Sequence, residues 1–258
     1  QAARQHGGQC LRCRAMKALV CMSLLLLGTC IAHAGSAPPP ANPLAIVTRN
    51  GIALRAEAHH SAAQHAVLWQ GENLEVRGRT LDYLQVYDHR IERGGFVRAS
   101  KVHILSTRPD AAPELLAVVR FLRDMPGSES LGIAYTAAYL KAAPGRDIDA
   151  EPFDALGVMA TRLAEHASSN HSKSDEQSLS GQLEVVAGYG VAINSINRNG
   201  HMRLCYDGDA FRRVMALGAP AMQQATAALA LTNPACVIPD QPPVQRAAFD
   251  AWRADLLD

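Results

Sequence analysis

The sequence has little that would commit it to a membrane, a repeat array or a nucleic acid. Its longest uncharged apolar run, from Ala18 to Ile31, has about 14 residues, whereas a membrane-spanning helix needs roughly 20. No repeat with a period of about 20–50 residues is visible, which excludes a stacked-repeat architecture. Basic and acidic residues number 25 and 24, so no excess of positive charge points to a nucleic acid or an anionic membrane.

The chain does not begin with methionine, and its first methionine, Met16, opens a segment typical of a secretory signal peptide. One basic residue, Lys17, precedes the apolar run, and a small-x-small sequence ends at Ala34. We expect cleavage after Ala34, so that the mature protein lacks residues 1–34 and is periplasmic or secreted. A membrane is then a partner only through the signal peptide. Acylation of Cys30 is the alternative, but it needs a small residue where Thr29 stands.

Only two of the six cysteines, Cys205 and Cys236, lie beyond residue 34. An even pair in an oxidising compartment predicts a disulfide, and two separate buried thiols are the alternative. Closing this loop would stabilise the fold by roughly 3–4 kcal/mol on the chain-entropy model. Removal of residues 1–34 also leaves 21 basic against 24 acidic residues, a net charge of about −3.

A proline-rich stretch, residues 35–45, is predicted to be an extended linker. In residues 46–106, short runs of alternating or β-branched residues are separated by glycines. They predict five strands, near residues 52–54, 67–69, 74–76, 84–86 and 96–97. Five short strands in so short a segment predict a small barrel, because closing the sheet hides its edge strands.

Four segments of this region follow a recognisable order. They are Ala53-Leu54-Arg55, then LWQGE at residues 68–72, DYLQV at residues 82–86, and GFVRAS at residues 95–100. This order resembles that of the bacterial SH3 domains, which have tryptophan where Tyr83 and Phe96 stand here. The resemblance covers about a quarter of the chain, and it implies an SH3-like barrel that binds a peptide or cell-wall peptidoglycan.

From Pro109 onward the apolar period changes to about 3.6, which predicts a mainly α-helical domain over residues 109–258. Caps and early prolines place helices near residues 110–124, 128–143, 149–163, 209–217, 220–231 and 244–257. The serine-rich segment 168–180 is predicted to be an exposed, disordered loop. Residues 182–206 are ambiguous between a helix and a hairpin that turns at residues 197–200, and we favour a helix.

The predicted barrel is the basic half of the chain. Residues 46–108 hold nine basic and six acidic side chains, whereas residues 109–258 hold 12 basic and 18 acidic ones. The basic side chains could face anionic wall polymers or the acidic helical domain, or they form an ordinary solvated face. The aromatic residues of the barrel could form a shallow groove for a peptide or sugar, or pack against the helical domain. The candidate ligand-binding residues are Trp69, Tyr83, Tyr87, Phe96 and Arg98.

No catalytic or metal-binding pattern rises above background. Cys205 with His201 lacks the sequence context of a papain-like wall peptidase, and a disulfide would consume the thiolate. Glu129-Ser130 matches part of a lytic transglycosylase motif, but the segment that should follow is absent. The histidines at positions 59, 60 and 65 lack the companion ligands of a metal site, and the aspartates at 207 and 209 are better explained as helix caps than as a calcium loop.

Taken together, the sequence predicts a multidomain α+β protein with a small SH3-like β-barrel followed by a mainly α-helical domain. We expect an exported binding or scaffolding protein without a cofactor or catalytic residues. Its partner would be a peptide, peptidoglycan or another envelope protein. The alternative is a cell-wall-processing enzyme whose site lies unrecognised in the helical domain.

Overall fold

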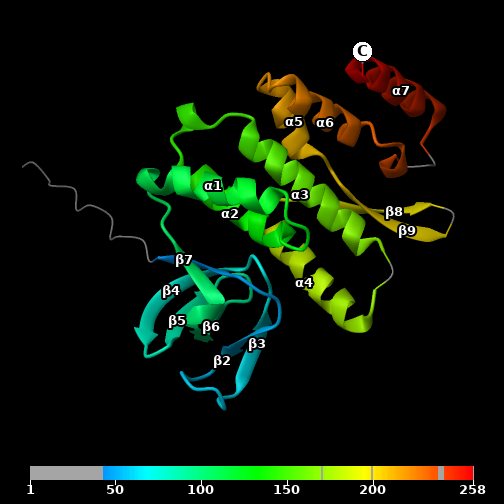
Figure 1. The fold of residues 1–258 in the computed structure, drawn as a ribbon. Coiled ribbons are helices and arrows are strands. Elements are labelled where there is room, and N and C mark those ends of the chain that lie inside the picture. The colour runs from blue at the N-terminus through cyan, green and yellow to red at the C-terminus, as the bar shows by residue number, and fades with distance from the viewer. Residues whose placement is uncertain (1–42, 170, 199, 238–240, 258) are drawn as a thin grey trace, which may run out of the picture. The chain divides into compact units, whose positions relative to one another are not determined.

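The computed structural model describes residues 43–258 except 170, 199, 238–240 and 258. The predicted signal peptide, residues 1–34, and all but the end of the predicted linker lie outside the described residues. Residues 41–258 form one compact unit. Its architecture is α+β, with an antiparallel sheet followed by helices and one hairpin (Figure 1). In the described part of the chain, no helix is both long and apolar enough to span a membrane.

The first part of the described chain is a seven-stranded antiparallel sheet with the strand order β3-β2-β6-β5-β4-β1-β7. Its strands are β1 (Leu44–Val47), β2 (Ile52–Arg55), β3 (Gln64–Leu68), β4 (Asn73–Thr80), β5 (Tyr83–Asp88), β6 (Arg93–Arg98) and β7 (Val102–Leu105). The predicted linker therefore ends too late, because Leu44 and Ala45 already belong to β1. This strand pairs with β4 on one side and β7 on the other, which buries Ala45 completely.

Alternating apolar residues on these strands form the sheet's own core. Leu84 and Val86 of β5 point inward, as their spacing predicted, and pack with Val97 of β6 and Leu54 of β2. The ladder between β4 and β5 is irregular between Val76 and Gly78. Such a bulge bends one strand and increases its local twist, so that a short sheet can curl around its own core.

The rest of the described chain is mainly helical. Its helices are α1 (Ala112–Arg123), α2 (Glu129–Ala142), α3 (Glu151–Ala167), α4 (Lys173–Gly188), α5 (Asp209–Ala216), α6 (Ala221–Leu231) and α7 (Pro243–Leu257). Helices α1–α4 share one apolar core that includes Ile133 and Leu163. At Gly132 of α2, an added Cβ would lie 2.1 Å from the sulfur of Met159, so glycine is what lets α2 and α3 approach this closely.

The serine-rich segment is not a loop, because α4 begins at Lys173. The side chain of Ser172 accepts a hydrogen bond from the Asp175 N–H at 3.3 Å and caps the helix. Further along, Leu179 and Val186 are buried against the other helices, and Val185 is buried beside the sheet. The polar composition of residues 168–180 therefore led to a wrong prediction of a loop. A capping residue and a narrow apolar stripe are enough to form a helix once other helices cover that stripe.

Residues 182–206 contain both of the structures that the sequence left open. Helix α4 continues to Gly188, and Gly190 then adopts a positive φ of 83°. Beyond it, β8 (Ile193–Arg198) and β9 (His201–Tyr206) form an antiparallel hairpin. The favoured helix was therefore wrong from Ile193 onward, where β-branched residues and the turn-forming residues 197–200 determine the structure.

The predicted disulfide between Cys205 and Cys236 is confirmed, with a Cα–Cα distance of 5.7 Å. It joins β9 to the short 3₁₀ turn Pro234–Cys236 that follows α6. Helices α5 and α6 build a small separate core around Phe211 and Val214. Phe211 also fits against α3 at Gly157, where an added Cβ would lie 2.6 Å from its ring.

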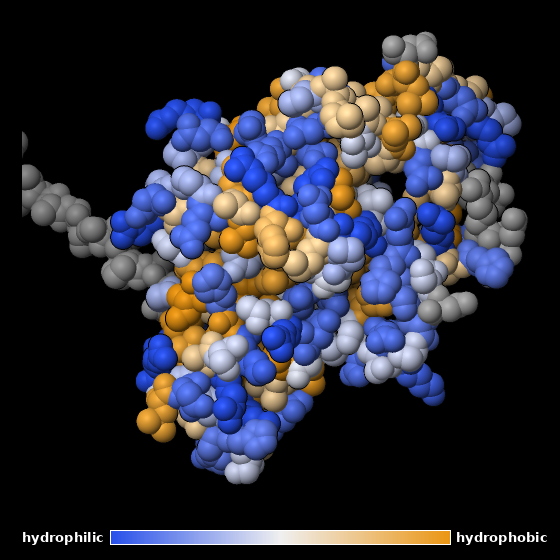
Figure 2. Space-filling view, in the orientation of Figure 1, coloured by the Kyte–Doolittle hydropathy of each residue, from blue (hydrophilic) through white to orange (hydrophobic). Residues whose placement is uncertain are grey.

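Helix α7 contributes no buried residue to the described structure. Large apolar side chains stand exposed at this end of the molecule, on α6 and on α7. They are Met222, Leu229, Val244, Trp252 and Leu257. Figure 2 shows apolar atoms over the α6–α7 end and further apolar patches over the sheet and the middle of this face, with hydrophilic side chains between them.

Candidate functional site

Four of the five predicted ligand-binding residues lie on one face of the strand pair β5–β6. Tyr83 pairs directly with Arg98, and the next pair along the same face is Gln85 with Phe96. Tyr87 follows two residues later on that face of β5. This face is the one opposite the sheet's core, to which the intervening Leu84 and Val86 belong. We call Tyr83, Tyr87, Phe96 and Arg98 the aromatic face.

The expected exposure of Tyr83 is wrong, because only 3% of this residue is accessible to solvent. The Arg98 guanidinium lies over its ring, 5.4 Å from the centroid, and Arg98 in turn pairs with Asp82 at 3.3 Å. The sequence pattern gave the right side of the strand, but it could not show that a neighbouring arginine would cover the ring. Tyr83 is therefore the buried member of the aromatic face.

Tyr87 is the more accessible tyrosine of the aromatic face. The Arg77 guanidinium stacks 3.9 Å from the centroid of its ring, and the His89 ring meets it edge-on at 4.9 Å. Phe96 is half-buried and lies directly opposite Arg55 of the neighbouring strand β2. Arginines thus alternate with aromatic rings over this part of the sheet, an arrangement suited to a ligand with flat and anionic groups.

Trp69 does not join the aromatic face. It lies in the turn between β3 and β4 and packs on α4 at Gly181, where an added Cβ would lie 2.4 Å from atoms of the indole ring. Of the two roles that the sequence allowed for the aromatic residues, packing against the helices is the one that Trp69 has. A glycine is required at position 181, because any side chain would displace the ring.

Trp69 borders a cluster of buried polar groups that the sequence did not reveal. The carboxylate of Glu72 is 2% exposed and accepts a hydrogen bond from the Trp69 N–H at 2.8 Å. It also accepts two from the Arg90 guanidinium, at 3.0 Å from Nε and 2.5 Å from Nη2. Asp88 is completely buried next to them, and its Oδ1 accepts from the Arg90 N–H at 2.8 Å.

Two buried carboxyl groups therefore share one arginine. Burial raises the pKa of Glu72 to about 7, and its contact with Asp88 adds to the effect against the opposing pull of the Trp69 N–H and Arg90. In the described structure, no N–H or O–H reaches Asp88 Oδ2. A proton on Glu72 supplies the missing donor, so the pair is best satisfied when it holds one proton.

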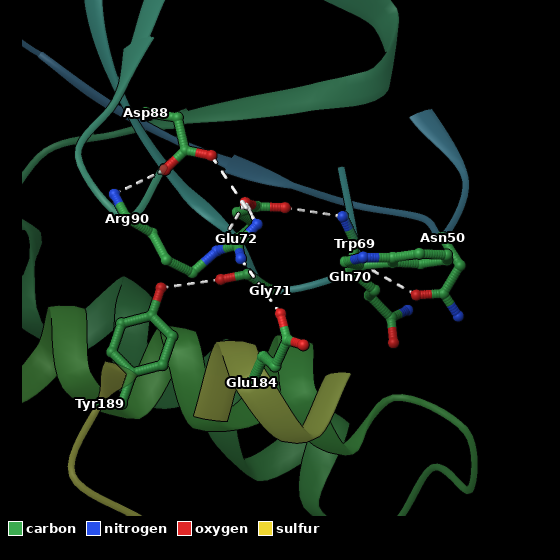
Figure 3. A network of polar contacts seen from close by, with 9 residues as sticks. All are labelled: Asn50, Trp69, Gln70, Gly71, Glu72, Asp88, Arg90, Glu184 and Tyr189. Atoms are coloured by element: carbon green, nitrogen blue, oxygen red, sulfur yellow. Dashed lines mark hydrogen bonds and ion pairs between the residues drawn. The ribbon is translucent and has the colours of Figure 1, made fainter. Parts of the chain in front are cut away.

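Helix α4 closes this cluster from the other side (Figure 3). Arg90 Nη1 donates to Glu184 at 3.2 Å, and the Tyr189 hydroxyl donates to the Gly71 carbonyl at 2.7 Å. Burial raises the pKa of Tyr189 well above its ordinary value, so this phenol remains a donor. We call Glu72, Asp88, Arg90, Glu184 and Tyr189 the joint, because they tie the sheet to α4.

The backbone beside the joint requires a glycine at position 71. Gly71 has a φ of 85°, a conformation that favours glycine. An added Cβ there would lie 2.4 Å from the Ser130 carbonyl oxygen at the start of α2. The Ser130 hydroxyl lies within 3.3 Å of both the Gln70 and the Gln182 amide oxygens. The turn between β3 and β4 is thus held against α2 as well as α4.

Two clefts among the described residues adjoin groups that could act on a ligand. One, of about 330 Å³, adjoins the joint and is lined by Glu72, Arg90, His89, Gly188 and Tyr189, among others. The other, of about 830 Å³, lies in the helical part between the β8–β9 hairpin, α5 and α7. Its walls carry Asn194, Asp207, Arg212, Phe249 and Trp252, and the disulfide lines it.

The groups considered for catalysis and metal binding have structural contacts. Glu129 is buried and pairs with Arg162, and Cys205 is held in the disulfide. His59 pairs with Glu57 on the surface, while Asp207 accepts from the Asp209 N–H at the start of α5. Within residues 43–258 as described, no group of three or more His, Cys, Asp or Glu side chains is placed to hold a metal ion.

With this geometry in hand, comparison with protein-family models, curated proteins and solved structures found no match. Function must therefore be argued from the site itself. The joint was missed because its members are scattered over residues 72–189 in ordinary surroundings. Of its members, only Glu72 lies in a segment that the sequence singled out, LWQGE at residues 68–72.

Proposed function

We propose that this protein is an exported binding or scaffolding protein whose sheet is an SH3-like barrel. Strand connectivity supports this proposal. A hairpin, β2–β3, interrupts the chain between β1 and β4, and β4, β5 and β6 then follow as neighbouring antiparallel strands. A 3₁₀ turn at Ala99–Lys101 leads into β7, which returns to pair with β1. This pairing brings the two ends of the region together in one sheet, as an SH3-like barrel would.

The observation that carries the proposal is the aromatic face. Tyr87, Phe96 and Arg98 share one side of β5–β6, and Arg77 lies over Tyr87 on that same side. Their surroundings are basic, since residues 46–108 carry three more positive than negative side chains. Peptidoglycan combines sugar rings, which stack on aromatic side chains, with peptide carboxylates, which pair with arginine. A peptide or a wall fragment is therefore the ligand class that this face fits best.

The same proposal explains why the sheet is fixed to the helices. Trp69 and the joint hold the turn between β3 and β4 against α4, while the aromatic face uses neither of them. A scaffold needs such a division, in which one side of the sheet is available to a ligand and another is occupied within the chain. The helical part then acts as a rigid support, with its own core and disulfide.

Sedimentation with purified peptidoglycan tests the proposal. The mature protein, beginning at Gly35, is expected to pellet with the wall polymer and to release no soluble muropeptides. Replacing Tyr87 with Ala should weaken the affinity for peptidoglycan roughly three- to tenfold. This fold-change corresponds to the free energy of one lost aromatic contact. The matched control is Phe121→Ala, which removes an aromatic residue that is 64% exposed on α1. Binding that survives Tyr87→Ala, or that Phe121→Ala weakens equally, would refute the role of the aromatic face.

The enzymatic alternative has one supporting observation, the cleft of about 830 Å³ in the helical part. Its volume is in the range of small-molecule sites, and it brings aromatic rings together with Asp207 and Arg212. Soluble muropeptides released in the same assay would favour this alternative. Protein that neither sediments nor releases fragments would instead indicate another envelope protein as partner, to be identified by crosslinking.

A further inference from the structure

The joint gathers three carboxyl groups around one guanidinium. Glu72 and Asp88 are buried on the sheet side, and Glu184 reaches the same Arg90 from α4. Glu184 is 61% exposed, so solvent screens its charge, and Arg90 can neutralise only one of the two buried carboxylates. Buried charge that is left uncompensated is strongly unfavourable, so the buried pair must either retain a proton or take in water as the pH rises.

A cleft gives water a route to the buried pair. Glu72 and Arg90 line the cleft of about 330 Å³, and its far wall is the C-terminal end of α4, at Gly188 and Tyr189. On the opposite side the two carboxyl groups face the sheet, where Asp88 is completely buried. Hydration of an ionised Glu72 would therefore begin at the contact between the sheet and α4.

Trp69 is coupled directly to this contact. Its backbone N–H donates to Glu72, and its indole ring lies on Gly181 of α4. Any movement of α4 away from the joint uncovers the indole ring. From this arrangement we propose that the joint is a proton-controlled contact, in which loss of the proton shared by Glu72 and Asp88 loosens α4 and exposes Trp69. The proposal goes beyond ligand binding by the aromatic face and does not depend on it.

Other groups around the cleft must be separated from this effect. His89 lies 2.8 Å from Glu75, and both residues line the same cleft. His89 is a titratable group at the same cleft as Glu72, so its contribution is separated by substitution. From α4, the facing groups are Glu184 and the Tyr189 hydroxyl, whose raised pKa keeps it protonated across neutral pH. From α2, Ser130 contributes a hydroxyl without charge.

The chain contains two tryptophans, so the variant Trp252→Phe leaves Trp69 as the only indole fluorophore. In this protein, quenching of Trp69 by acrylamide is measured between pH 5.5 and pH 8.5. We expect the quenching constant to rise at least about twofold, with a midpoint near 7, where Glu72 loses its proton. A quenching constant that stays flat over this range, in folded protein, overturns the proposal.

Three further substitutions in the Trp252→Phe background identify the responsible group. Glu72→Gln cannot ionise and should keep Trp69 protected at every pH. Asp88→Asn removes the neighbouring negative charge and should move the midpoint to lower pH. His89→Gln should leave the transition unchanged. A transition that persists in Glu72→Gln, or that disappears in His89→Gln, overturns the proposal.

Hydrogen exchange provides a test that needs no substitution. Backbone amides of residues 69–73 and 183–189 should exchange faster at pH 8.5 than at pH 5.5, after correction for intrinsic rates, while amides in α3 remain protected. Uniform loss of protection over the whole chain would mean global unfolding and would contradict a local contact. This measurement also covers the case in which Glu72→Gln fails to fold.

Discussion

Buried carboxylates are paired with arginines differently at the joint and in the helical core. In the helical core, Glu129 pairs with Arg162, and Asp154 pairs with Arg123, which also reaches the exposed Asp124. Neither of these arginines serves two buried acids. At the joint, Glu72 and Asp88 share Arg90, which also reaches Glu184. The helical pairs fix one helix against another, whereas the joint fixes the sheet against a helix.

The comparison shows how the same chemistry gives either a permanent or a conditional contact. A one-to-one pair is electrically balanced as it stands, and its removal from water is compensated by direct hydrogen bonds. A shared arginine leaves one acid unbalanced, and a proton is the least disruptive way to balance it.

The largest effect is expected in the helical core, from Arg162→Ala. This change leaves Glu129 buried without its partner and also removes donors to the Arg123 and Met125 carbonyls. We expect unfolding free energy to fall by about 3–5 kcal/mol in urea titrations at pH 7. The control is Arg120→Ala, whose pair with Glu151 is solvent-exposed and should be worth less than about 1 kcal/mol. Equal losses would show that burial does not distinguish the two pairs.

The second effect is a pH dependence of stability that originates at Glu72. Its pKa rises from 4.5 to about 7 on folding, so the folded protein holds a proton that the unfolded chain releases between these values. Stability should therefore fall as pH rises from about 4.5 to 7, by about 3 kcal/mol, and level off above 7. Glu72→Gln should remove this slope and be the more stable protein at pH 8. Urea titrations across this range that give parallel profiles for both proteins would contradict the assignment.

A smaller loss is expected from Gly181→Ala, which tests the packing of Trp69 on α4. The new methyl group would meet the indole ring, so we expect a loss of about 1–3 kcal/mol despite the better helix propensity of alanine. Gly188→Ala is the matched control, since nothing lies within 4 Å of its added Cβ. In a Trp69→Ala background the cost of Gly181→Ala should vanish. If it persists there, the indole ring is not what requires glycine.

The smallest effect concerns the start of α4, which carries the helical half of the joint. Ser172→Ala removes the side-chain acceptor of the Asp175 N–H and should cost about 1 kcal/mol in thermal or urea unfolding. Ser180→Ala, on the exposed side of the same helix, should be neutral or slightly stabilising. If both variants behave alike, capping does not decide where α4 begins.

Much of the local structure was predictable because it depends on short-range patterns. Alternation matches the inward side chains of β5, and the 3.6-residue apolar spacing located most helices. The N-cap side chains of α1, α2 and α3 make no capping hydrogen bond. Prediction failed where tertiary contacts outweigh local composition. Strand β1 follows prolines but is paired on both sides, and α4 has a serine-rich start but a stripe that other helices cover. Four of the residues that the sequence named as ligand-binding share one face of β5–β6, although Tyr83 is buried, and their binding role stays a prediction. The sequence missed the joint.

The sequence by itself determined the α+β class and the pairing of Cys205 with Cys236, because periodicity and an even cysteine count are properties of the chain. Only the tertiary structure decided that Trp69 lies against α4 and that two acids share Arg90. These contacts join residues as far apart as Gly71 and Tyr189, and their energies depend on burial, which no local pattern encodes.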